Sequence, residues 1–143
     1  MAQYVTTIPS SMSPQQAFAY MADLRNFAQW DKGVVKVEQV KGDGAGLGTI
    51  FDVTVKGFGG TNSTLRYTTT EYDEHTNILV KGVNTLFTSI DRVTITPTST
   101  GCDVVYDATL TANWIIAPMN LVLGKVFNKI GDTATRGLRK VLA

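Results

Sequence analysis

Residues 87–112 read FTSIDRVTITPTSTGCDVVYDATLTA and alternate apolar with polar side chains in two runs. Alternation with a period of two is typical of a strand that has one buried face. The stretch therefore predicts a hairpin of two strands, 87–96 and 103–112, joined by a turn at 97–101. We expect the apolar face of this hairpin to hold three pairs of opposite residues: Ile95 with Val104, Val93 with Tyr106, and Asp91 with Ala108.

The same period of two recurs along the chain before this hairpin. It predicts further strands at residues 3–8, 34–41, 49–56, 61–72 and 78–84. With a turn at 57–60, three more pairs share one face: Val55 with Ser63, Val53 with Leu65, and Phe51 with Tyr67. Because all six pairs fall on one largely apolar face, we expect one antiparallel sheet of seven strands.

Two helices are expected at the ends of this run of strands. Ser13 is a good cap, the proline after it suits a first helical position, and an apolar stripe carries this helix to about Trp30. The second helix starts near Pro118 and has apolar side chains at every third or fourth position until Val141. Consecutive strands between two helices predict the α+β class, and the length suits one domain, 1–143.

Composition and charge exclude several classes of protein. The formal net charge is +1, so the chain lacks the basic surface typical of nucleic-acid binding, and we expect no nucleic-acid partner. One cysteine allows no internal disulfide and no cysteine metal cluster, and we expect no metal and no cofactor. The most apolar stretch, 114–123, is too short to span a membrane. The first residues have no secretory pattern. We therefore predict a cytoplasmic protein without stable membrane insertion, monomeric or weakly homodimeric.

Several segments of the chain resemble a known superfamily. They are SPQQAF at 13–18, FAQWD at 27–31, GCDVVYDATL at 101–110 and FNKIGD at 127–132. Together, and in this order, they are similar to the SRPBCC superfamily in its bacterial polyketide cyclase/dehydrase-like branch. The resemblance implies the helix-grip fold of START-like and birch-pollen-allergen-like proteins, a curved seven-stranded antiparallel sheet wrapped around a long C-terminal helix. It also implies an apolar or amphipathic ligand between sheet and helix, and only some members are enzymes.

From this fold we expect a ligand cavity between the apolar face of the sheet and the C-terminal helix. Its expected wall combines apolar residues of the strands, large side chains of the helical segments, and a few polar groups that would orient a ligand. These residues are Trp30, Phe51, Val53, Val55, Leu65, Tyr67, Asn84, Asp91, Val93, Tyr106, Ala108, Leu110, Trp114, Met119, Leu123 and Phe127.

Asp91 and Tyr106 are the candidate catalytic pair, because both point to the apolar face from neighbouring strands. A carboxyl group in an apolar cavity has a raised pKa and serves as a general acid or base. A tyrosine hydroxyl polarises a carbonyl group by donating a hydrogen bond to it. This combination suits dehydration or aldol-type cyclisation. The alternative is that Asp91 lies at the end of its strand, in solvent or paired with Arg92 or a backbone amide.

The other chemically distinctive residues do not point to a functional site. His75 lies in the polar run 73–77 and is expected in an exposed turn, and Cys102 is expected in a hairpin turn as an incidental thiol. The glycine-spaced loop 42–48 precedes a strand rather than a helix, so it is not a phosphate-binding loop. We interpret it as a hairpin loop or as a rim of the cavity.

Three functions are compatible with the sequence. The first is binding or carriage of a small hydrophobic ligand, either lipid-like or polycyclic and polyketide-like. The second is a cofactor-independent cyclase or dehydratase that uses Asp91 and Tyr106. The third is a protein-interaction or stress-response module, which would have a filled interior and an apolar surface patch. Finally, the basic face of the last helix, beside residues 114–116, fits either a solvated helix face or a membrane-docking surface.

Overall fold

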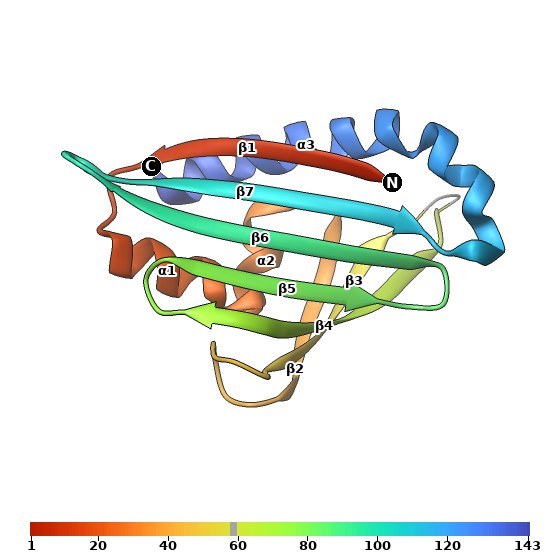
Figure 1. The fold of residues 1–143 in the computed structure, drawn as a ribbon, viewed down its shortest axis with the longest axis horizontal. Helices are drawn as coiled ribbons and strands as arrows, with labels where there is room; N and C mark the ends of the chain where they lie inside the picture. Colours follow the sequence, from red (N-terminus) through yellow and green to blue (C-terminus); the bar gives the residue numbers. More distant parts are fainter. Residues whose placement is uncertain (58–59) are drawn as a thin grey trace.

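One antiparallel sheet of seven strands organises the molecule, in the order β1-β7-β6-β5-β4-β3-β2 (Figure 1). The computed structural model describes residues 1–57 and 60–143; Phe58 and Gly59, in the predicted turn 57–60, lie outside the described residues. The strands are β1 (Ala2–Ser10), β2 (Val34–Lys41), β3 (Ile50–Lys56), β4 (Asn62–Asp73), β5 (Asn77–Val83), β6 (Phe87–Thr98) and β7 (Gly101–Ala112). Since β1 pairs with β7, the first and last strands of the chain lie side by side at one edge of the sheet.

The predicted register is confirmed in both hairpins. In β3 and β4, Val53 lies opposite Leu65, and in β6 and β7, Asp91 lies opposite Ala108. The turn predicted at 97–101 is shorter than expected, because β6 continues through Pro97. Pairing of β5 with β6 stops at Thr94. At Pro97, β6 therefore pairs with β7 alone. A proline, which has no backbone N–H, is tolerated in a strand that has a neighbour on only one side.

The first helical region is three short pieces rather than the single helix predicted. They are α1 (Pro14–Ala22), the 3-10 turn η1 (Leu24–Asn26) and α2 (Phe27–Trp30). Ser13 caps α1 as expected, with its hydroxyl accepting from the Gln16 N–H. The helix ends because Asp23 is extended, at φ −92° and ψ 101°, and its carboxylate accepts the Arg25 N–H to start the next turn.

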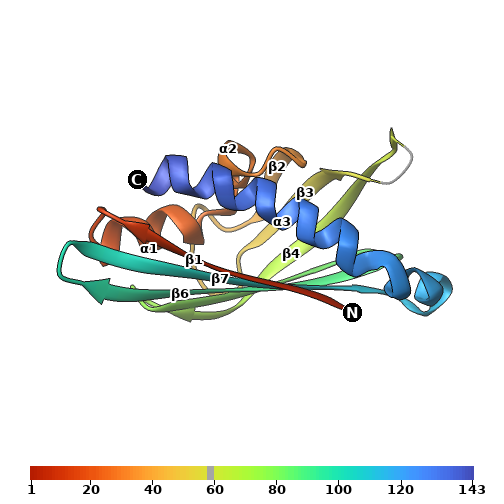
Figure 2. The ribbon, with the colours of Figure 1, turned by 90° about the horizontal axis from the view of Figure 1, so that it is seen from above.

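The C-terminal helical region crosses the concave face of the sheet, on the same side as α1 and α2 (Figure 2). It consists of the 3-10 segment η3 (Trp114–Met119) and the helix α3 (Asn120–Leu142). Leu138 and Leu142 of α3 are completely buried. A side chain at Gly137 would collide with the Trp30 carbonyl oxygen, so glycine is what allows α3 to approach α2 this closely.

Candidate ligand-binding site

A cavity of about 700 Å³ lies between the concave face of the sheet and α3. This volume is within the range of small-molecule sites, and most of the wall is apolar. The structure places these residues from the sequence analysis on its wall: Trp30, Val55, Leu65, Tyr67, Asp91, Tyr106, Ala108, Leu110, Met119 and Phe127. They come together because alternate residues of β3, β4, β6 and β7 face the stripe of α3 that points at the sheet.

Four apolar residues that the sequence places on this wall lie elsewhere. Phe51 and Val53 share the predicted face but are fully buried in the packed core. Val93 lies next to a separate space of about 20 Å³, beside Met21 of α1. Leu123 is also fully covered. Alternation and helical spacing predict which face a residue shares, but not whether a neighbouring segment covers it or leaves it beside open space.

The other two corrections concern Asn84 and Trp114. Asn84 follows β5 and closes the hairpin to β6: its amide oxygen accepts the backbone N–H groups of Leu86 and Phe87 at 2.9 and 2.8 Å. Its amide nitrogen donates to the Ser63 hydroxyl. Trp114 begins η3, and its side chain is 86% exposed. Neither side chain is therefore part of the cavity wall.

Asp91 is the centre of a buried hydrogen-bond network in the cavity. Its carboxylate accepts the Tyr106 hydroxyl at 2.6 Å and the Ser89 hydroxyl at 2.9 Å. The residue is only 4% exposed, and Arg92 donates to Glu71 instead, so Asp91 is neither solvated nor paired with Arg92. Desolvation raises the pKa of Asp91 to about 6, although both hydrogen bonds act to lower it. The carboxyl group therefore changes charge just below neutral pH.

Two tyrosines adjoin Asp91. Tyr106 packs edge-on against the Trp30 ring, with 5.4 Å between ring centroids. The Tyr67 ring lies directly over Gly82 of the neighbouring strand, where any side chain would collide with it. Burial and the charge of Asp91 raise the pKa of both phenols well above the ordinary value, so both keep their protons.

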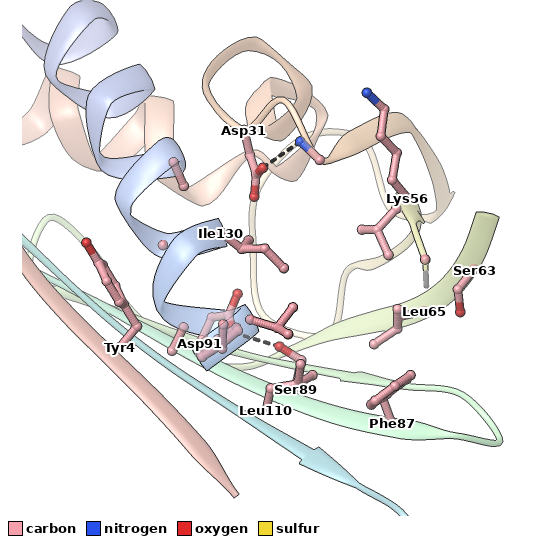
Figure 3. Close-up of a pocket in the computed structure, with 18 of the residues that line it drawn as sticks. Tyr4, Asp31, Lys56, Ser63, Leu65, Phe87, Ser89, Asp91, Leu110 and Ile130 are labelled. Atoms are coloured by element: carbon pink, nitrogen blue, oxygen red, sulfur yellow. Dashed lines mark hydrogen bonds between the residues drawn. The ribbon is translucent and has the colours of Figure 1, made fainter. Parts of the chain in front are cut away.

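Asp31 is a cavity residue that the sequence analysis missed. It follows α2, and Figure 3 shows its carboxyl group pointing from the loop toward the space that Asp91 and Ser89 face from the sheet. The carboxylate accepts the Gly33 N–H at 2.8 Å. Desolvation raises the pKa of Asp31, against that hydrogen bond. The polar run Trp30-Asp31-Lys32-Gly33 gave no signal of burial, because it matches an exposed helix end.

The remaining distinctive residues lie outside the cavity. His75 is exposed in the β4–β5 turn, as predicted, and its ring touches Phe18 edge-on. Cys102 is buried in strand β7 instead of the turn, because the hairpin turn is shorter than predicted. Residues 42–48 do not belong to the cavity wall, so they form the β2–β3 loop and not a rim. Within the described part of the chain, no three His, Cys, Asp or Glu side chains gather as metal ligands.

An exposed apolar patch lies at the junction of η3 and α3. We define it by Trp114, Ile115, Leu121 and Val122, of which Leu121 is 90% exposed. Residues 116, 119 and 126 of the same two elements belong to the cavity wall, so the patch lies close to the cavity. None of the helices in residues 1–57 and 60–143 is both long and apolar enough to cross a membrane.

Comparisons with known proteins agree with this arrangement. The family model described as "Polyketide cyclase / dehydrase and lipid transport" matches residues 1–143. A START superfamily protein from Mycobacterium smegmatis has a TM-score of 0.78 at 14% identity, over 99% of this chain and 97% of that one. Ginseng major latex-like protein 151 from Panax ginseng has a TM-score of 0.70 at 9% identity, over 99% and 97%.

A third solved structure is the di-domain ARO/CYC protein StfQ of the steffimycin biosynthetic pathway. It matches with a TM-score of 0.74 at 14% identity, over 99% of this chain and 50% of that one. No curated protein sequence matches the chain. At these identities the structural matches establish the fold, and that fold is the helix-grip fold predicted from the sequence.

Proposed function

This chain belongs to the polyketide cyclase/dehydrase and lipid transport family, and from that premise we propose that it binds a small hydrophobic ligand between the sheet and α3. The observation that carries the proposal is the cavity of about 700 Å³ with a mostly apolar wall. Burial of apolar ligand surface would supply most of the binding free energy, and the few polar groups would orient the ligand. The description of the family, which names polyketide cyclases and lipid transport, is compatible with a lipid-like or a polycyclic ligand.

Binding of the neutral fluorescent probe N-phenyl-1-naphthylamine tests the proposal. We expect Leu110→Trp, which fills space on the cavity side of β7, to weaken probe binding at least about tenfold. Thr109→Trp is the matched control, since the Thr109 hydroxyl lies on the other side of β7, near the Ile90 carbonyl oxygen. The proposal fails if the probe does not bind, or if both variants bind it like the wild type. Native mass spectrometry of the gently purified protein would identify a retained ligand.

Acid–base catalysis by Asp91 and Tyr106 is a second candidate function, favoured by the geometry of this pair. A carboxyl group with a pKa near 6 is ionised at neutral pH and is a stronger base than an ordinary aspartate. On a bound ketone, the carboxylate would take a proton from the α-carbon. The Tyr106 hydroxyl, which donates to Asp91 in this structure, would donate to the developing enolate oxygen instead.

Deuterium exchange at the α-carbons of 2-tetralone, followed by NMR, tests this second function. We expect the wild type to exceed the buffer rate and Asp91→Asn to return to it, while the variant still binds the naphthylamine probe. A wild-type rate equal to that of buffer, alongside normal probe binding, would leave a binding protein without this chemistry.

The interaction-module hypothesis receives mixed support. A cavity of about 700 Å³ argues against the filled interior that this hypothesis needs. The exposed apolar patch of η3 and α3 is the surface that such a module, or a membrane-docking protein, would use.

A further inference from the structure

The charges of the cavity wall are unevenly distributed. Two carboxyl groups, Asp31 and Asp91, belong to the wall from opposite sides of the cavity. Among the described wall residues Lys56 is the one basic side chain. It is exposed, and Figure 3 shows its amine turned away from Leu65 and Ser89. The inner part of the cavity therefore holds two carboxyl groups, and no basic side chain among the described wall residues lies opposite them.

The hydrogen-bonding groups near these carboxylates are also uneven. The Tyr106 and Ser89 hydroxyls both donate to Asp91, so their protons are already engaged. The Asp31 carboxylate accepts the Gly33 N–H through one oxygen, and no other hydrogen bond from the described residues reaches this carboxylate. The protonated Tyr67 hydroxyl is a further donor on this part of the wall. Because each carboxylate has about four acceptor positions, hydrogen-bond acceptors still outnumber donors there.

We infer that the cavity discriminates by the polar end of its ligand, and binds apolar molecules that end in a hydrogen-bond donor, an alcohol or an amine, in preference to carboxylic acids of the same size. This inference rests on the proposed ligand-binding function. A donor end would form charge-assisted hydrogen bonds with Asp31 or Asp91. An acid would bring a third negative charge beside two others in surroundings of low dielectric constant, where repulsion is strong.

Competition among three ligands with the same twelve-carbon chain tests the inference. Dodecan-1-ol, dodecylamine and dodecanoate would displace N-phenyl-1-naphthylamine at pH 8, the alcohol below its solubility limit and the other two below their critical micelle concentrations. Burial raises the pKa of Asp91 to about 6, so at pH 8 this group is charged. We expect the alcohol and the amine to compete at least about tenfold better than dodecanoate.

The possible outcomes separate the inference from the function on which it rests. Equal or better competition by dodecanoate would overturn the selectivity while confirming that an apolar ligand binds. Failure of the probe to bind, together with no binding of any of the three compounds by calorimetry, would overturn the proposed function itself.

A pair of variants tests the part played by Asp31. Asp31→Asn removes one negative charge, and its amide oxygen still accepts the Gly33 N–H. We expect it to improve dodecanoate binding relative to dodecan-1-ol by about tenfold. Asp43→Asn is the matched control, because Asp43 is exposed in the β2–β3 loop and outside the cavity wall. If Asp31→Asn and Asp43→Asn leave the same ratio of affinities, the carboxyl groups do not select the ligand.

Discussion

Burial of the Asp91 carboxyl group makes the stability of the protein depend on pH. Its pKa rises from an ordinary 3.8 to about 6 in the folded protein, chiefly through desolvation. Between pH 4 and pH 6 the folded state therefore holds a proton that the unfolded chain has already released. The contribution of this group to the free energy of unfolding consequently falls as pH rises through that window, and the loss is complete above about pH 6.

Replacement of Asp91 by Asn removes this titration while keeping the shape of the side chain. We expect the free energy of unfolding of Asp91→Asn, relative to the wild type, to rise by roughly 2–3 kcal/mol from pH 4 to pH 7. Urea unfolding at several pH values measures it, with Asp43→Asn as the control for removing one carboxyl group. A difference between Asp91→Asn and wild type that is the same at every pH would contradict the assignment.

The two cavity carboxyl groups show what the sequence can reveal about single residues. Asp91 was predictable, because alternation along β6 puts its side chain on the same face as Val93 and Ile95. Asp31 was not, because its position depends on a tertiary arrangement, the closeness of α3 to the loop after α2. Nothing in the local sequence distinguishes it from an exposed aspartate that follows a helix.

At the scale of elements, the strands were predicted better than the helices. The period of two, together with short turns, determined the pairings of both hairpins correctly. The single helix predicted for 14–30 is broken at Asp23, whose carboxylate caps the start of the 3-10 turn η1. The apolar stripe continues across the break, since Leu24 and Phe27 stay buried, and this continuity concealed the boundary.

Two tryptophans in helical segments differ in burial because one ends its element and the other begins its own. Trp30 ends α2, is 6% exposed and stacks on Phe27 at 4.6 Å between ring centroids, whereas Trp114 is 86% exposed. We expect Trp30→Ala to lower the free energy of unfolding by about 3–5 kcal/mol. Trp114→Ala should change it by no more than about 0.5 kcal/mol.

Urea denaturation followed by far-ultraviolet circular dichroism measures both variants in the same way. Equal losses of stability in Trp30→Ala and Trp114→Ala would mean that Trp114 packs against other residues in solution.

At the scale of the whole molecule, the order of strands and helices predicted the α+β class, and the resemblance to a known superfamily implied the helix-grip fold. Neither predicted the shape of the cavity. Phe51 and Leu65 occupy neighbouring strands and the same face, yet only Leu65 lies on the cavity wall. Which part of a face is covered depends on how the sheet curves and where α3 crosses it. These are properties of the assembled chain, and no local periodicity determines them.

The attachment of α3 to the sheet differs between its two halves. The C-terminal half is fixed by buried Leu138 and Leu142 and by the Tyr4 hydroxyl, which donates to Asp132 at 2.7 Å. In the N-terminal half Leu123 is the one buried side chain of the described residues, and the Asn120 amide bonds both backbone groups of Ala112. Since few contacts hold this half over the cavity, we expect it to open locally and admit the ligand.

Hydrogen exchange measured by mass spectrometry tests this difference within α3. We expect amides of residues 121–131 to exchange at least about tenfold faster than those of 134–142, because local opening is less costly where fewer apolar contacts must break. Saturation with N-phenyl-1-naphthylamine should slow the first group more than the second, since the probe would pack against the N-terminal half. If the probe protected only residues 134–142, the ligand would enter from the other end of the helix, and the N-terminal half of α3 would be a fixed part of the wall.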